Sequence, residues 1–137
     1  MEKKKGKLTI VTQVDDGAEQ SVSYDAEIDL TAVSAVLRYQ DGQSSACIKI
    51  DREEVLIERT GDYLISLRLK ENEKFPASLG VAGNVGQIFT HTDSIKYAIT
   101  KTSVLLTMQY SLLFSDTERQ RMKIRLHARQ NDYLEEK

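Results

Sequence analysis

The sequence predicts an all-β protein in which a single antiparallel meander closes into a barrel of about eight to ten strands. Apolar and polar residues alternate through nearly every segment, and the breaks between segments carry Gly, Asp, Asn or Ser. A helix is hard to place anywhere along the chain. Ten strands in a chain of 137 residues would leave exposed edges unless the sheet closed, so we expect a closed barrel.

The strands follow one another along the chain with tight turns between them. The predicted strands are residues 7–15, 20–28, 33–40, 44–50, 54–60, 63–69, 86–92, 95–101, 103–114 and 118–129. Successive side chains of a strand point to opposite faces, so each strand contributes alternate residues to the interior. This inward set is Leu8, Ile10 and Val14; Val22, Tyr24, Ala26 and Ile28; Ala35, Leu37 and Tyr39; Ala46, Ile48 and Ile50; Val55 and Ile57; Ile65, Leu67 and Leu69; Ile95, Tyr97 and Ile99; and Val104, Leu106, Met108, Tyr110, Leu112 and Phe114.

Residues 70–86 break the alternation. Pro76 and the glycines Gly80, Gly83 and Gly86 fall in this stretch, and proline cannot donate a hydrogen bond to a strand ladder. We therefore predict a long excursion here, with residues 76–86 acting as a flap near the mouth of the barrel. The chain is expected to be one domain over residues 1–137, with frayed termini at 1–6 and 131–137.

Composition excludes several classes of protein. Hydrophobic residues make up 40% of the chain and charged residues 29%, an ordinary globular balance. A single cysteine, Cys47, excludes an intramolecular disulfide and fits the reducing cytoplasm. The Lys-rich N-terminus lacks the apolar stretch of a secretion signal. No run of about 18 apolar residues is present, so no membrane span is expected.

Two stretches of the chain resemble a known family. Residues 49–57, with Arg59 and Gly61 after them, are similar to the YwiB-like family of small bacterial β-barrel proteins. So is the ending, in which Gly86 and Ile88 precede a Thr-rich strand and then Tyr110, Leu112, Met122 and Ile124. The similarity extends over about residues 35–128. The resemblance implies a calycin-like, or lipocalin-like, barrel whose activity is unknown.

The last strand has one apolar and one basic face. Its alternating basic residues are Arg119, Arg121, Lys123, Arg125, His127 and Arg129, and those from Arg121 to Arg129 are a candidate surface for an anionic partner. The alternative is that this face is solvated or pairs with acidic residues, because Asp25, Glu27 and Asp29 alternate in the same way on an early strand. A net charge of −2 and the absence of aromatic residues from 119–129 disfavour nucleic acid.

A second candidate site lies inside the barrel. Arg59 continues the inward phase of Val55 and Ile57, and a buried guanidinium needs a partner. It could close the end of the barrel, or it could bind the acid group of a small ligand. The inward tyrosines Tyr24, Tyr39, Tyr97 and Tyr110 carry hydroxyl groups that also need partners. These five residues are the candidate ligand-binding residues.

No catalytic, metal-binding or cofactor-binding residues are predicted. His91 and His127 lack other ligands at metal-binding spacing. Nothing beside Cys47 indicates activation of the thiol. The glycines at 80, 83 and 86 are not set between a strand and a helix, as a phosphate-binding loop would require.

The sequence therefore favours a non-catalytic protein that binds a small amphipathic or anionic ligand in the barrel interior. The alternative is a packed barrel that acts as a protein-interaction module through the Arg119–Arg129 face. The sequence predicts no membrane partner and leaves a homodimer open, and barrels that host chemistry keep an enzyme as a third hypothesis.

Overall fold

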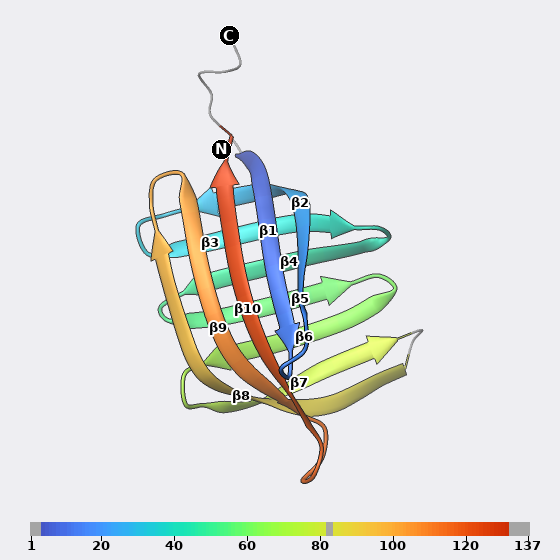
Figure 1. The fold of residues 1–137 in the computed structure, drawn as a ribbon. Coiled ribbons are helices and arrows are strands. Elements are labelled where there is room, and N and C mark those ends of the chain that lie inside the picture. Colours follow the sequence, from blue (N-terminus) through green and yellow to red (C-terminus); the bar gives the residue numbers. More distant parts are fainter. Residues whose placement is uncertain (1–3, 82–83, 132–137) are drawn as a thin grey trace.

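Ten antiparallel strands and no helix make up the part of the chain that the computed structural model describes, residues 4–81 and 84–131 (Figure 1). The strands are β1 Lys5–Val14, β2 Glu19–Leu30, β3 Ser34–Asp41, β4 Ser44–Asp51, β5 Glu54–Thr60, β6 Tyr63–Lys70, β7 Lys74–Val81, β8 Asn84–Ile99, β9 Ser103–Leu113 and β10 Arg119–Gln130. Each strand pairs with the next, and β1 pairs with β10, so the ladder closes. The predicted all-β barrel is confirmed.

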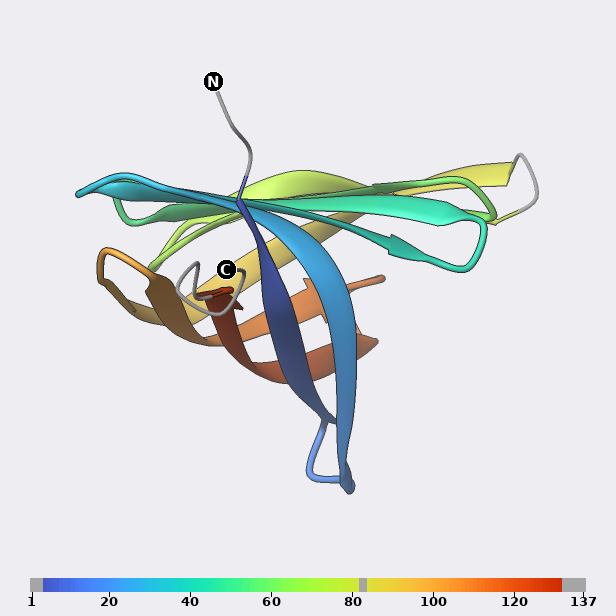
Figure 2. The same ribbon diagram turned by 90° about the horizontal axis from the view of Figure 1, so that it is seen from above.

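The barrel is flattened into two layers whose strands cross. Strands β3 to β7 form a flat layer, and β1, β9 and β10 run across it on one side (Figures 1 and 2). The corner strands β2 and β8 each pair with one layer along one part and with the other layer along another, and the two parts overlap by two or three residues. In β8 the register shifts between Thr92 and Ser94, and such a bulge lets a strand bend. The two strands predicted at 86–92 and 95–101 are therefore one bent strand.

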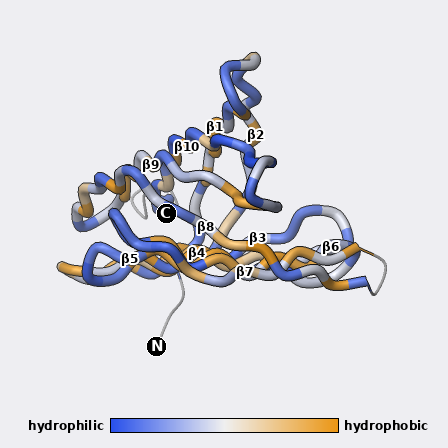
Figure 3. Tube along the Cα trace, turned by 90° about the horizontal axis from the view of Figure 1, so that it is seen from below, coloured by the Kyte–Doolittle hydropathy of each residue, from blue (hydrophilic) through white to orange (hydrophobic). Residues whose placement is uncertain are grey.

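The core lies between the two layers. Its largest fully buried apolar side chains are Leu8, Ile28, Leu37, Ile50, Leu69, Leu106, Met108, Val55 and Val104, and each contributes about 1.5–3 kcal/mol by burial. Most of the predicted inward set belongs to this core. The exceptions Val14, Val22 and Phe114 are exposed. The two valines belong to the β1–β2 hairpin, which projects from the layers and is largely hydrophilic (Figure 3).

The predicted excursion at residues 70–86 is wrong, because β7 is a regular strand there. Its pairing with β6 covers only Tyr63–Ser66 opposite Ser78–Val81. Pro76 lies outside this ladder, so the N–H that proline lacks is not needed for a hydrogen bond to β6. The Arg68 carbonyl of β6 instead accepts a hydrogen bond from the Thr90 hydroxyl of β8, at 3.0 Å. A proline is thus accommodated within the sheet. Of the predicted flap, residues 82–83 lie outside the described residues.

Strand β1 begins earlier than predicted. Lys5 and Gly6 belong to the strand, and Gly6 pairs with Ala26 of β2 and Gln130 of β10. Strands β1 and β10 approach so closely here that a Cβ on Gly6 would lie 2.0 Å from the Arg129 carbonyl oxygen. Within the predicted frayed ends, residues 1–3 and 132–137 lie outside the described residues. The described residues contain no helix of the length and hydrophobicity needed to cross a membrane.

Candidate functional site

A row of paired residues across the flat layer places Arg59 beside tyrosine. The row runs from Ala26 of β2 through Tyr39, Ala46 and Arg59 to Ile65 of β6. All five side chains have the inward phase. The two alanines are small and buried, so they leave room on either side of the Tyr39 ring and beside the Arg59 side chain.

Five residues form a polar group at this place, which we call the Arg59 cluster: Tyr24, Tyr39, Asp41, Arg59 and Tyr63. Arg59 Nη2 lies 2.8 Å from Asp41 Oδ2, and the Tyr24 hydroxyl donates to the same oxygen at 3.3 Å. The Tyr24 and Tyr39 rings lie with their centroids 4.5 Å apart. The guanidinium lies over the Tyr63 ring, 5.6 Å from its centroid, in a cation–π contact.

The Arg59 cluster is partly withdrawn from water. The Arg59 side chain is 21% exposed and that of Asp41 37%. Burial raises the pKa of Tyr39 to about 12 and, together with the Asp41 carboxylate, raises that of Tyr24. Both hydroxyls therefore keep their protons at neutral pH and can donate hydrogen bonds.

One donor of the Arg59 cluster has no acceptor. Arg59 Nε is buried and forms no hydrogen bond with any described residue. An unpaired buried donor costs about 1–3 kcal/mol, more for a charged group. Arg59 and Asp41 thus form a pair through Nη2, and the Nε–H of the guanidinium has no acceptor among the described residues.

Turns hold the Arg59 cluster in place. The β5–β6 turn at Gly61 has a φ of +118°, and a Cβ there would lie 2.7 Å from the Gln43 carbonyl oxygen of the β3–β4 turn. Only glycine tolerates both conditions. The close contact of the two turns brings the end of β5, with Arg59, against the end of β3, with Asp41.

Three of the five predicted ligand-binding residues lie together in this cluster: Tyr24, Tyr39 and Arg59. The other two do not. The Tyr97 hydroxyl accepts the backbone N–H of Glu53 at 3.2 Å. Tyr110 is buried on β9, where burial raises its pKa to about 12, and it makes no hydrogen bond or ring contact with the cluster.

Asp41 and Tyr63 are residues that the sequence reasoning missed. Asp41 directly follows the strand predicted at 33–40, and it shares the inward phase of Leu37 and Tyr39. Tyr63 likewise shares the phase of Ile65 and Leu67. Alternation alone was therefore a sufficient signal that both side chains point inward.

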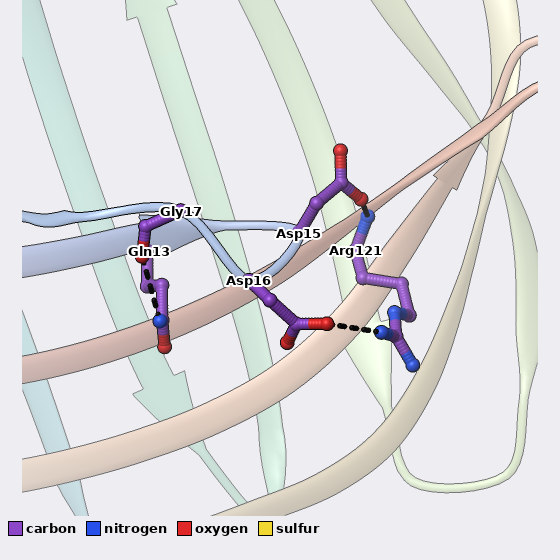
Figure 4. Close-up of polar contacts among 5 residues, drawn as sticks. All are labelled: Gln13, Asp15, Asp16, Gly17 and Arg121. Atoms are coloured by element: carbon purple, nitrogen blue, oxygen red, sulfur yellow. Dashed lines mark hydrogen bonds and ion pairs between the residues drawn. The ribbon is translucent and has the colours of Figure 1, made fainter.

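The predicted basic row lies on the outside of β10. The β1–β2 turn contacts the start of this row: Asp15 Oδ1 accepts the Arg121 backbone N–H at 2.9 Å, and Asp16 Oδ2 lies 3.1 Å from the Arg121 guanidinium (Figure 4). Arg125 Nη2 lies 3.4 Å from Glu19 Oε1 at the start of β2. Gln13, which donates to the Gly17 carbonyl at 2.8 Å, braces the same turn.

The sequence left open whether this row pairs with the early acidic strand, and two of the acids of that strand have other partners. Strand β1 lies between β2 and β10. Asp25 instead pairs with Lys7 of β1, whose ammonium lowers the pKa of the carboxyl, and Asp29 pairs with Arg38 of β3. The first and last strands do come together, but the acids that reach β10 come from the β1–β2 turn and the start of β2.

Hollows of the described surface lie mainly outside the barrel. One of about 810 Å³ is on the outer face of β2 to β5 and is lined by Arg38, Cys47 and Glu58 among others.

The described residues hold no grouped metal ligands. His91 Nδ1 lies 3.6 Å from Asp93 Oδ1. Within residues 4–81 and 84–131, no three His, Cys, Asp or Glu side chains are grouped so as to hold a metal ion.

Comparison with known proteins places the chain in a family. A family model described as Domain of unknown function (DUF1934) matches residues 7–126. The chain belongs to this family. The matched span includes the whole Arg59 cluster and most of the barrel. Comparison with curated proteins finds no match.

A solved structure shares the family's fold. The crystal structure of the YwiB protein from Bacillus subtilis is similar to this chain with a TM-score of 0.75 and 14% sequence identity. The similarity covers 95% of this chain and 94% of that one. Together with the family match, it confirms the resemblance to YwiB-like proteins, and at this identity it concerns the fold.

Proposed function

We propose that the protein binds a small amphipathic molecule with a carboxylate head group at the Arg59 cluster, without catalysing a reaction on it. The observation that carries this proposal is the buried Arg59 Nε that lacks an acceptor among the described residues. A carboxylate accepts two parallel hydrogen bonds from one guanidinium. Its second oxygen then supplies the missing acceptor.

The surroundings suit the rest of such a ligand. Ile65 and Leu79, next in the row beyond Arg59, are half-buried, and Val22 near Tyr24 is 47% exposed. An apolar tail laid on them would bury their remaining surface. The core beyond is filled by side chains, so the ligand lies at the end of the barrel rather than within its centre.

Asp41 has a defined part in this binding. Its carboxylate already occupies one side of the Arg59 guanidinium, so a ligand carboxylate has to approach or replace it. Asp41 lies at the end of β3 and is partly exposed, which allows its side chain to turn into water. Removing the Asp41 charge is therefore expected to strengthen binding of an acid.

Titration with straight-chain acids tests the proposal. Hexanoate, octanoate and decanoate are added to isotope-labelled protein, chemical shifts of the backbone amides are followed by NMR, and hexanol serves as the uncharged probe. We expect the acids, and not the alcohol, to shift amides around Arg59 and Ile65, with affinity rising with chain length because each CH₂ buried adds about 0.8 kcal/mol.

Three variants separate binding from stability. Arg59→Met is expected to weaken octanoate binding at least about tenfold, since a charge-assisted hydrogen bond contributes about 1.5–3 kcal/mol. Asp41→Asn is expected to strengthen it. Arg68→Met, which removes an exposed arginine paired with Glu54 on the outer face, is the matched control. Unchanged octanoate binding by folded Arg59→Met, or equal binding of hexanol, refutes the proposal.

A further inference from the structure

A contiguous part of the sheet carries no carboxylate. Residues 94–115 and 119–131 contain seven Lys or Arg and one His but no Asp or Glu, although the whole chain has more acids than bases. These residues form the second half of β8, all of β9 and all of β10, which are neighbours in the barrel. We call the outer surface of these strands the β8–β10 basic face. Its charged residues on the strands are Lys96, Arg119, Arg121, Lys123, Arg125, His127 and Arg129.

Strand register sets the spacing of these charges. Thr107 of β9 lies between Lys96 of β8 and Arg125 of β10, and Gln109 is paired with Lys123. Adjacent strands are about 4.8 Å apart, so hydrogen-bonding side chains of β9 separate Lys96 of β8 from the cations of β10, which occupy every second position of that strand. This face therefore offers several separated positive charges with polar groups between them.

An apolar side chain lies among these cations. Leu105 is 55% exposed, and its neighbours in the ladder are Ala98 of β8 and His127 of β10. Arg129 and Arg125 lie two residues away from His127 on the same face of β10. The β8–β10 basic face thus combines positive charge with one exposed apolar contact.

Most of this charge is not neutralised by the described residues. Arg121 and Arg125 have acidic partners in Asp16 and Glu19, but all four side chains are more than half exposed, and such pairs contribute about 0–1 kcal/mol. Lys96, Lys123 and Arg129 form no ion pair with any described residue. They are available to an external anion.

The shape and chemistry of this face favour a polypeptide over other anions. A hollow of about 260 Å³ is lined by Val11, Glu19, Thr107, Lys123 and Arg125 among others. Its Glu19 carboxylate already pairs with Arg125, which leaves Lys123 for an external acid, and a hollow suits the narrow side chains of a peptide better than a flat bilayer. Within residues 94–115 and 119–131 the aromatic residues are Tyr97 and Tyr110, both of inward phase, and Phe114, which is exposed just beyond the end of β9. No aromatic ring is therefore interleaved with the cations, as a surface on which bases stack would require.

We propose that the β8–β10 basic face binds an acidic segment of a partner protein. Glutamate or aspartate side chains of that segment pair with Lys96, Lys123 and Arg129, and an apolar side chain contacts Leu105. Exposed charges of this kind set the association rate and the choice of partner more than the final affinity. The proposal is independent of ligand binding at Arg59, which lies on the inside of β5.

Fluorescence anisotropy with a rhodamine-labelled peptide of alternating glutamate and leucine tests this inference. The test variant is K96E/K123E, and the matched control K49E/K70E reverses two other exposed lysines, on β4 and β6, that form no ion pair with a described residue. Both variants have the same net charge. We expect K96E/K123E to weaken peptide binding about tenfold or more, because each reversal replaces an attraction by a repulsion of up to about 1 kcal/mol.

Three controls show whether binding depends on this face. Binding should fall with added salt, should be lost with a glutamine–leucine peptide, and should be unchanged in Arg59→Met. Equal weakening by K96E/K123E and K49E/K70E overturns the proposal, because net charge would then account for the binding. Tighter binding of an RNA oligonucleotide, or of vesicles containing phosphatidylserine, at the same salt concentration also overturns it in favour of that partner.

Discussion

Replacing Gly6 by alanine tests how closely the ends of the barrel are joined. Gly6 lies on β1 between Ala26 of β2 and Gln130 of β10. An added Cβ would lie 2.0 Å from the Arg129 carbonyl oxygen and 2.7 Å from Ile28 Cδ1. Contacts to a Cβ shorter than about 3 Å do not persist in a close-packed interior, so β1 and β10 have to separate by about 1 Å at this pair.

The cost follows from what that separation disturbs. The N–H of Asn131 donates to the Lys5 carbonyl at 2.8 Å and that of Ile28 to the Lys4 carbonyl at 2.7 Å, and each bond contributes about 1 kcal/mol. Ile28 is completely buried, and overpacking beside it costs about 1–3 kcal/mol. The reduced freedom of the unfolded chain returns about 0.4–1 kcal/mol. The expected net loss in the free energy of unfolding is about 2–4 kcal/mol.

Urea unfolding with linear extrapolation measures this loss. Gly86→Ala is the matched control, because a Cβ there would meet only the Leu79 carbonyl oxygen at 3.8 Å, an ordinary contact. We expect it to change stability by less than about 1 kcal/mol. If Gly6→Ala lies within about 0.5 kcal/mol of the parent, the spread of neutral surface changes, or if both variants lose equal stability, the close approach of β1 to β10 is refuted.

Two further predictions concern stability. Asp15→Ala is expected to lower the free energy of unfolding by about 1–2 kcal/mol, because the Arg121 N–H loses its acceptor. Asp15→Asn should be milder, since Asn keeps that acceptor and tolerates the φ of 48°, and Asp16→Ala, at an exposed residue, should change stability by less than about 0.5 kcal/mol. Urea unfolding of the three variants checks this, and equal losses contradict it. Burial raises the pKa of Tyr39 and Tyr110 to about 12 from an ordinary 10.0, so the unfolded chain loses these protons at lower pH than the folded protein does. Stability should therefore hold below pH 10 and fall between pH 10 and about 12, by up to about 1.4 kcal/mol per pH unit for each tyrosine. Urea unfolding at rising pH checks this: Tyr39→Phe should reduce the slope, and constant stability to pH 11 contradicts the prediction.

Alternation predicted most of the barrel because it reports burial directly. Strands with one face in the core, such as β4 with Ala46, Ile48 and Ile50, alternate without interruption. Strand β7 was missed because Pro76 and the glycines at 80, 83 and 86 are typical of a loop. The feature that allows proline there is a hydroxyl from Thr90, fourteen residues later in the chain, and no local pattern contains that information.

The sequence predicted that side chains of the Arg59 cluster point inward, but it could not predict which of them lie next to one another. Phase showed that Tyr24, Tyr39 and Arg59 point inward, and it would have shown the same for Asp41. Which inward residues meet depends on register, since tyrosines of equal phase lie at different heights in a barrel. Tyr97 is such a residue: it points inward as predicted, but its hydroxyl bonds to the backbone at Glu53.

The basic row shows how one intervening strand changes an electrostatic prediction. With β1 between β2 and β10, an acid on β2 has to reach across a strand, roughly 10 Å in all, to meet a cation on β10. Glu19, at the free end of the hairpin, reaches Arg125, whereas Asp25 finds Lys7 on β1 itself. Compensation is therefore confined to the part of β10 near the hairpin turn. Arg129, near the other end of β10, has no acidic partner within the described chain, and this is the charge on which the proposed partner binding depends.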